Sequence, residues 1–293
     1  MFEQLGLIGC GLMGGSFALA LKKAGLVKRV VVYSKSPSTT ERALQLGVID
    51  VEAPSALLAV SGADIVLLAV PVSATEATLK AIRHLITPQM LVMDVGSTKR
   101  NVIDAARRML RDQVGVFVPA HPIAGREVAG VEHADADLYA GKQVILTPIE
   151  RTLTTQLQKA QDVCTAMGCH VLKMSPEAHD AAFAAVSHLP HLIAFALING
   201  ISSQDHGRDF LSLAGPGLRD FTRIAASEPA IWRDILIANR EELLTQSKIF
   251  QRTLQAMELM ISSGNADALE DLIEQASHTR GTWRMVAGKT PKS

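Results

Sequence analysis

The sequence predicts an α/β protein in which a doubly wound, mostly parallel sheet is followed by an all-helical domain. Short apolar segments typical of buried strands alternate with helical segments as far as residue 174, which is the pattern of consecutive βαβ units. From residue 177 to about residue 277 there is helical periodicity and no convincing strand. We therefore predict two domains, residues 1–174 and residues 175–293.

The composition indicates a globular chain without an obvious macromolecular partner. With 293 residues, 48% hydrophobic and 20% charged, the chain is long enough for about two domains with sizeable cores. Lys plus Arg and Asp plus Glu number 29 each, so no net charge favours nucleic acid or an anionic membrane.

Targeting and redox signals indicate the cytoplasm. The N-terminus enters the first strand almost at once without a basic segment, so we expect no signal peptide. The longest apolar runs, such as residues 192–198, are expected to be too short to cross a bilayer. Cys10, Cys164 and Cys169 form no CxxC pair, which fits a reducing compartment. We therefore expect a soluble cytoplasmic protein.

The first predicted strand, residues 5–8, runs into the pattern Gly9-x-Gly11-x-x-Gly14, and a helix to about residue 24 follows. In that setting Gly9 makes a tight turn, Gly11 lets a pyrophosphate approach the backbone, and Gly14 allows close packing of helix on strand. A purely structural glycine turn is the alternative. The context favours a Rossmann-type site for a nicotinamide or flavin nucleotide.

The second predicted strand, residues 29–34, lacks the acid that usually holds the ribose 2′-hydroxyl of NAD. Ser34-Lys35-Ser36 follows instead, and the next acid is Glu41, so we favour NADP over NAD. A solvated turn is the alternative. The residues predicted to bind the cofactor are Gly9, Gly11, Leu12, Met13, Gly14, Ser34, Lys35, Ser36 and Val70.

Five more apolar segments predict the rest of the sheet. They are residues 64–70, 91–96, 115–120, 143–147 and 169–174, with helical segments between most of them. Continuous apolar strands separated by helices indicate a mostly parallel sheet that is covered on both faces.

The predicted helical domain contains one segment, residues 181–199, that is apolar nearly all round. Such a helix must be covered on every face. A small helical domain rarely covers so much, so we expect a homodimer formed through this domain. Residues 286–293 are expected to form a frayed tail.

Two candidate catalytic residues follow predicted strands, where open parallel sheets bind ligands. Ser97 follows the fourth strand, and His121 closes the fifth. The alternatives are a helix N-cap for Ser97 and a structural loop histidine for His121.

A polar stripe crosses the apolar helix, because Asp180, Ser187, His188 and His191 share one helical face. Buried polar groups need partners, so the stripe forms an internal network or lines a ligand cleft. Pro190 should kink the helix. No Cys or Glu with ligand spacing joins the histidines, so we expect no metal site.

Arg219 and Arg223 lie on one face of a later helix and resemble a clamp for an anionic substrate, with Asp220 tethering Arg223. A solvated basic face is the alternative. In the next helix, Ser227 is the expected N-cap, and Trp232 taken alone is more typical of a core.

Five motifs in this order resemble prephenate and arogenate dehydrogenases of tyrosine biosynthesis, over residues 5 to about 280. They are the glycine loop, Asp94-Val95-Gly96-Ser97-Thr98-Lys99, His121-Pro122-Ile123-Ala124-Gly125, Ser187-His188-Leu189-Pro190-His191 and Asp220-Phe221-Thr222-Arg223-Ile224-Ala225. The resemblance implies a dinucleotide-binding domain followed by a helical dimerisation domain.

The resemblance also implies an activity, the oxidative decarboxylation of a cyclohexadienol with hydride transfer to NAD(P)+. By that resemblance His121 accepts the proton of the ring hydroxyl, Ser97 orients this histidine and contacts the same hydroxyl, and Arg223 holds the ring carboxylate. The other residues expected around the substrate are Ser187, His188, His191, Glu127, Trp232 and Asp180.

The sequence is compatible with more than one role for Arg126 and with two other classes of protein. Arg126 stands where family members often carry Thr, and it faces the substrate, the cofactor or solvent. A β-hydroxyacid dehydrogenase is an alternative, but residues 181–199 contain no lysine of the kind those enzymes use. A non-catalytic NADP-binding sensor is another. The sequence does not decide between prephenate and arogenate, or whether tyrosine inhibits.

Overall fold

The computed structural model describes residues 1–284, and its first domain is built on a parallel sheet of six strands. The order in the sheet is β3-β2-β1-β4-β5-β6, and every neighbouring pair is parallel. The strands are β1 (Phe2–Ile8), β2 (Val27–Tyr33), β3 (Val51–Glu52), β4 (Ile65–Leu68), β5 (Leu91–Asp94) and β6 (Phe117–Val118). The predicted doubly wound parallel sheet is confirmed.

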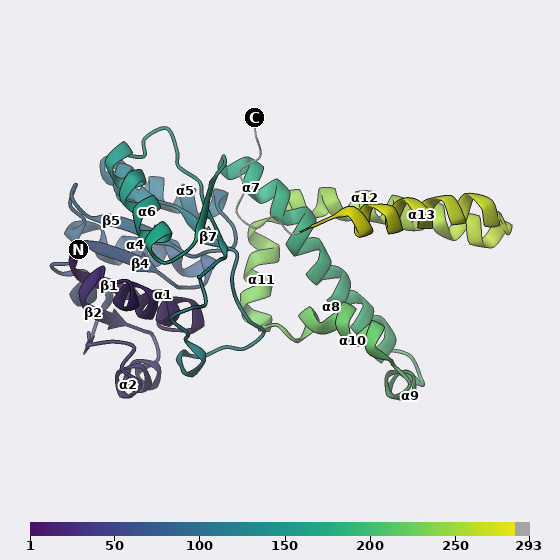
Figure 1. Ribbon diagram of the computed structural model, residues 1–293, viewed down its shortest axis with the longest axis horizontal. Coiled ribbons are helices and arrows are strands. Elements are labelled where there is room, and N and C mark those ends of the chain that lie inside the picture. The colour runs from purple at the N-terminus through teal and green to yellow at the C-terminus, as the bar shows by residue number, and fades with distance from the viewer. Residues whose placement is uncertain (285–293) are drawn as a thin grey trace.

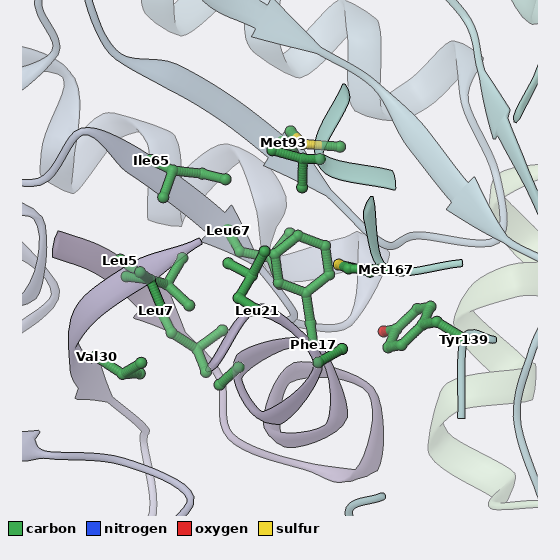
Figure 2. Packing of buried hydrophobic residues seen from close by; sticks show 14 of the residues in the cluster. Leu5, Leu7, Phe17, Leu21, Val30, Ile65, Leu67, Met93, Tyr139 and Met167 are labelled. Atoms are coloured by element: carbon green, nitrogen blue, oxygen red, sulfur yellow. The ribbon is translucent and has the colours of Figure 1, made fainter. Parts of the chain in front are cut away.

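Helices cover both faces of this sheet (Figure 1). They are α1 (Leu12–Lys23), α2 (Pro37–Gln45), α3 (Ala56–Val60), α4 (Thr75–Ile82), α5 (Arg100–Leu110) and α6 (Thr154–Ala166). Successive strand residues point to opposite faces, so Leu67 packs in one core with α1, whereas Leu68 packs in a second core with α4 and α5. Figure 2 shows the first core, where Phe17 of α1 lies against the sheet.

The predicted fifth strand is split, and the prediction of a single sheet was wrong here. Strand β6 ends at Val118, Pro119 follows, and Ala120–Pro122 form β7 in a separate sheet with β8 (Gln143–Leu146) and β9 (His170–Lys173). Strands β7 and β8 are antiparallel. Proline has no N–H to donate to a ladder, so Pro119 ends the pairing with β5. His121 therefore lies within β7 rather than at the end of the parallel sheet.

From Pro176 to Thr282 the secondary structure consists entirely of helices. They are α7 (Pro176–Phe183), a π-helical turn η5 (Ala184–His188), α8 (Leu189–Ser202), α9 (Gly207–Ser212), α10 (Pro216–Thr222), η6 (Arg223–Ala226, a 3₁₀ turn), α11 (Pro229–Ala238), α12 (Arg240–Ser263) and α13 (Ala266–Thr282). In Figure 1, α12 and α13 lie side by side and project away from the sheet domain. The tail expected at residues 286–293 lies outside the described residues.

Helices α7, η5 and α8 join into one stretch, Pro176–Ser202, of 27 residues. By length and composition alone it is apolar enough to cross a membrane, so the expectation that every apolar run is too short was wrong. The core helix of a soluble protein has the same character. In the single chain only 22% of the most apolar part of this stretch is buried, so much of its apolar surface is uncovered.

Candidate active site

A cavity of about 430 Å³ is lined by residues of both domains, beyond the carboxyl ends of β1, β4 and β5. The strand order reverses between β1 and β4, and open parallel sheets bind ligands at such a point. Residues 124–130 and helix α11 complete the wall. The predicted site residues that line the cavity are Gly11, Leu12, Met13, Gly14, Val70, Ser97, Glu127 and Trp232.

Three glycines shape the loop between β1 and α1. Gly9 has a φ of 91°, and a Cβ there would lie 2.3 Å from the carbonyl oxygen of Ala69. A Cβ on Gly14 would lie 2.4 Å from the carbonyl oxygen of Gly9, so glycine lets α1 approach the strand. Gly11 lines the cavity with open space in place of a Cβ. The loop therefore leaves the amino end of α1 accessible to a phosphate.

His121 lies at the start of a buried chain of polar side chains. Its Nδ1 lies 2.8 Å from Nε2 of His179, and Nδ1 of His179 lies 2.8 Å from Oδ1 of Asp180. An ionised carboxylate only accepts, so His179 donates from Nδ1 and accepts at Nε2. His121 must then donate from Nδ1, which leaves the Nε2 lone pair of His121 free to accept a proton.

The protonation states in this chain follow from burial and from its hydrogen bonds. Burial opposes ionisation of Asp180, but hydrogen bonds from His179 and from the backbone of Arg100 and Lys99 lower its pKa. Burial, and then the nearby charges of His179 and Lys99, hold the pKa of His121 well below 6.5. His121 is therefore neutral at pH 7, which is the form that a proton acceptor needs.

A buried ion pair fixes the backbone next to His121. Nζ of Lys99 donates to Oδ2 of Asp94 at 2.5 Å and to the carbonyl of Ala120 at 2.6 Å. Oδ1 of Asp94 accepts from the N–H of Ala120 at 3.0 Å. Both backbone groups of the residue before His121 are thus bound. Sequence reasoning gave neither partner a role, because only the fold brings β5 beside β7.

The carboxylate of Asp180 caps helix α5 across the domain junction. Oδ1 accepts from the N–H of Lys99 at 2.8 Å, and Oδ2 accepts from the N–H of Arg100 at 2.9 Å. The N-cap position of α5 is Lys99, so Ser97 does not have the capping role that we considered for it. Because the oxygens of Asp180 are occupied at the junction, a contact between Asp180 and substrate stays a prediction.

Next to Pro190, where a kink was predicted, the helix contains the π-helical turn η5. Proline lacks an N–H and clashes with the carbonyl four residues before it. The chain adopts a π-helical turn over Ala184–His188, and α8 begins with Pro190 in its first turn. Such turns are frequent at functional sites. This turn contains Ser187 and His188 of the polar stripe.

The two histidines of the stripe have different partners. His188 is fully buried, and its Nδ1 lies 3.0 Å from Nδ2 of Asn239. His191 donates from Nδ1 to the carbonyl of Ser187 at 2.9 Å, and its ring stacks on Trp232 with a centroid separation of 3.3 Å. The stripe is therefore part internal network and part neighbour of the cavity. Between residues 1 and 284, no group of three or more His, Cys, Asp or Glu side chains has metal-site geometry.

Arg223 is exposed and forms an ion pair with Glu127, which lines the cavity. Asp220 pairs instead with Arg219 at 3.2 Å, so the predicted tether between Asp220 and Arg223 was wrong. In the folded chain, the acid paired with Arg223 is therefore Glu127, and the acid paired with Arg219 is its neighbour Asp220. The N-cap of α11 is likewise Glu228 and not Ser227.

Profiles of two domains match nearly the whole chain. The prephenate dehydrogenase nucleotide-binding domain matches residues 17–173, and the prephenate dehydrogenase dimerization domain matches residues 175–275. The chain belongs to the prephenate dehydrogenase family.

Individual relatives agree with this assignment. Prephenate dehydrogenase of Bacillus subtilis is 35% identical over 92% of this chain and 73% of its own length. Cyclohexadienyl dehydrogenase of Zymomonas mobilis is 33% identical over 96% of both chains. The crystal structure of Aquifex aeolicus prephenate dehydrogenase with hydroxyphenyl propionate and NAD+ is 34% identical, with a TM-score of 0.89 over 96% of this chain and 97% of that one.

In this member of the prephenate dehydrogenase family, some of the predicted site residues line the cavity and the others do not. Gly9, Ser34, Lys35, Ser36, His121, Asp180, Ser187, His188, His191 and Arg223 are not in the lining. Sequence reasoning assigned no role to four residues of the buried network, Asp94, Lys99, His179 and Asn239. His179 carried a signal because it lies beside Asp180 in an apolar helix, and Asp94 and Lys99 stand at the two ends of one of the five motifs.

Proposed function

We propose that this chain catalyses the NAD(P)-dependent oxidative decarboxylation of prephenate, L-arogenate or both, giving 4-hydroxyphenylpyruvate or L-tyrosine. The observation that carries the proposal is the neutral His121, whose free Nε2 is fixed by His179 and Asp180 within a fold shared with prephenate and cyclohexadienyl dehydrogenases. These relatives give no support to a β-hydroxyacid dehydrogenase or to a non-catalytic sensor. The enzyme would act in the cytoplasm.

The proposed base is His121, which removes the proton of the ring hydroxyl while the ring loses its carboxylate as carbon dioxide and becomes aromatic. Nε2 accepts the proton, and Nδ1 keeps its hydrogen bond to His179. The ionised Asp180 then stabilises the positive charge through His179. When it is bound, a nicotinamide supplies the hydride acceptor. The main task left to the protein is alignment of the reacting carbon.

Arg223 is the proposed partner of the ring carboxylate. Its guanidinium is exposed and paired with Glu127, so substrate must compete with or join this ion pair. Ser187, His188, His191 and Trp232 are the other proposed substrate neighbours. Stacking of His191 on Trp232, which lines the cavity, supports this grouping.

The loop geometry fits a dinucleotide, since Gly11 leaves room for a pyrophosphate at the amino end of α1. For NADP over NAD the support is local. Lys35 and Ser36 are exposed after β2, and helix α2 begins directly behind them.

The proposed assembly is a homodimer through the helical domain. Large apolar side chains are exposed on α12 and α13, including Leu244, Ile249, Leu254, Leu259, Ile261 and Ile273. Helix α13 buries none of its residues in the single chain. A second copy of the same surface would cover these side chains, as the dimerization-domain match supports.

Initial rates of nicotinamide reduction test the function in a two-by-two grid, prephenate or L-arogenate against NAD+ or NADP+. Activity in any combination supports the proposal, and the pattern assigns substrate and cofactor together. An NAD-only pattern would remove the NADP preference. No activity in all four, from folded protein that binds nucleotide, would overturn the enzyme assignment.

A further inference from the structure

We propose that Asn239 is a positioning residue of this active site, whose amide fixes the tautomer of His188 and ties the start of α12 to α7. The inference rests on the proposed function, in which His188 belongs to the substrate surroundings. Asn239 is 3% exposed and lies between α11 and α12, far in sequence from both residues that it contacts.

The orientation of the Asn239 amide follows from its partners. Nδ2 lies 2.8 Å from the carbonyl oxygen of Asp180, and a carbonyl can only accept. The amide nitrogen, and not its oxygen, must therefore face this group. The same NH₂ lies 3.0 Å from Nδ1 of His188, so its second hydrogen is donated there. The NH₂ group of Asn239 therefore binds both Asp180 and His188 of the long apolar helix.

The tautomer of His188 is a consequence of this contact. Because Nδ1 accepts from Asn239, the ring hydrogen must be on Nε2. Burial lowers the pKa of His188 to about 4, so the ring stays neutral at pH 7. Nε2 is buried and has no side-chain hydrogen-bond partner within the described part of the chain. Asn239 thus holds a buried N–H donor in a fixed place.

This donor lies among residues of the cavity wall. The ring of His188 packs edge-on against Trp232 at a centroid separation of 6.2 Å, and the backbone of Ser97 acts on the ring as a hydrogen-bond acceptor, which raises the pKa of His188 against the larger effect of burial. Both Trp232 and Ser97 line the cavity. His191 has the opposite arrangement, since its Nδ1 donates to Ser187 and its Nε2 is left to accept. The stripe therefore offers one fixed donor and one fixed acceptor.

Asn239→Asp tests the proposal with almost no change in shape. A carboxylate cannot donate to Nδ1, so His188 must take a proton there, and its pKa should rise. We expect kcat to fall about tenfold, in the range that coupled neighbours show, with nucleotide affinity unchanged. A new ionisation should appear in the pH profile of kcat. Histidine ¹⁵N NMR should show protonation at Nδ1 of His188.

Two further variants separate positioning from a merely structural role. Asn265→Asp makes the same substitution at the exposed N-cap of α13 and should leave rates and pH profile unchanged. His188→Gln replaces the ring with an amide donor that has no tautomers. In that background, Asn239→Asp should cost less than twofold, because the residue through which it acts is gone.

A loss of kcat in Asn239→Asp with the Nε2–H tautomer intact and no new ionisation would overturn the proposal and leave Asn239 a packing residue. Full additivity in the double variant would do the same. If the wild-type protein oxidises neither substrate, the proposed function fails, whereas the NMR signals of His188 in both proteins still decide the role of Asn239.

Discussion

At the scale of single residues, the site depends on which nitrogen carries each hydrogen. Asp180 is ionised, so it orders His179, and His179 in turn orders His121. The sequence singled out His121 as a candidate, but it could not show this order, because residues 121 and 179 meet only after β7 and α7 pack together. Ser97, expected to orient His121, lies in the cavity wall, while His179 occupies Nδ1 of His121.

His121→Asn should abolish turnover with little change in substrate binding. The amide cannot accept the ring proton, and general-base removal typically lowers kcat by about 10²- to 10⁴-fold. Initial rates and equilibrium binding of substrate measure the two effects separately. His170→Asn, at the exposed first residue of β9, is the matched control and should keep normal rates. Near-normal turnover in His121→Asn would show that another group is the base.

At the scale of secondary structure, the elements that the sequence predicted are those with a local cause. The glycine loop and the apolar strands are visible because a positive φ and burial on both faces of the sheet leave marks in adjacent residues. The separate sheet of β7, β8 and β9 was missed because it depends on the pairing of β7 with β8, more than twenty residues later. The capping of α5 by Asp180 is equally non-local.

Asp180→Asn should weaken the junction of α5 with α7. The side chain accepts from two backbone N–H groups and from His179, and hydrogen bonds to a buried charged group are worth about 1.5–3 kcal/mol each. Asparagine keeps one acceptor, so we expect the free energy of unfolding to fall by about 2 kcal/mol. Urea unfolding measures this change. Asp205→Asn, at an exposed loop position, should leave it unaltered, and equal stability of both variants would contradict the capping role.

At the scale of the whole molecule, the two domains differ in how much of their apolar surface is buried within a single chain. The sheet domain has two closed cores, whereas the long α12–α13 pair buries only Leu243 in the single chain. The sequence indicated this imbalance through the apolar residues 181–199, but it did not identify α12 and α13 as the larger open surface. Their mixture of charged and apolar residues resembles an ordinary solvated helix until the fold shows which of their large apolar side chains are exposed.

Ile261→Glu should therefore convert a dimer into a monomer. Ile261 is 64% exposed near the end of α12, and a carboxylate buried between two copies would lack a partner. Light scattering after size exclusion measures the mass, which should be twice 31.4 kDa for the wild type and 31.4 kDa for the variant. Leu58→Glu, on α3 of the nucleotide domain and 50% exposed, is the control and should stay dimeric. A monomeric wild type would contradict the proposed dimer. A dimeric Ile261→Glu would show that the interface lies elsewhere on the helical domain.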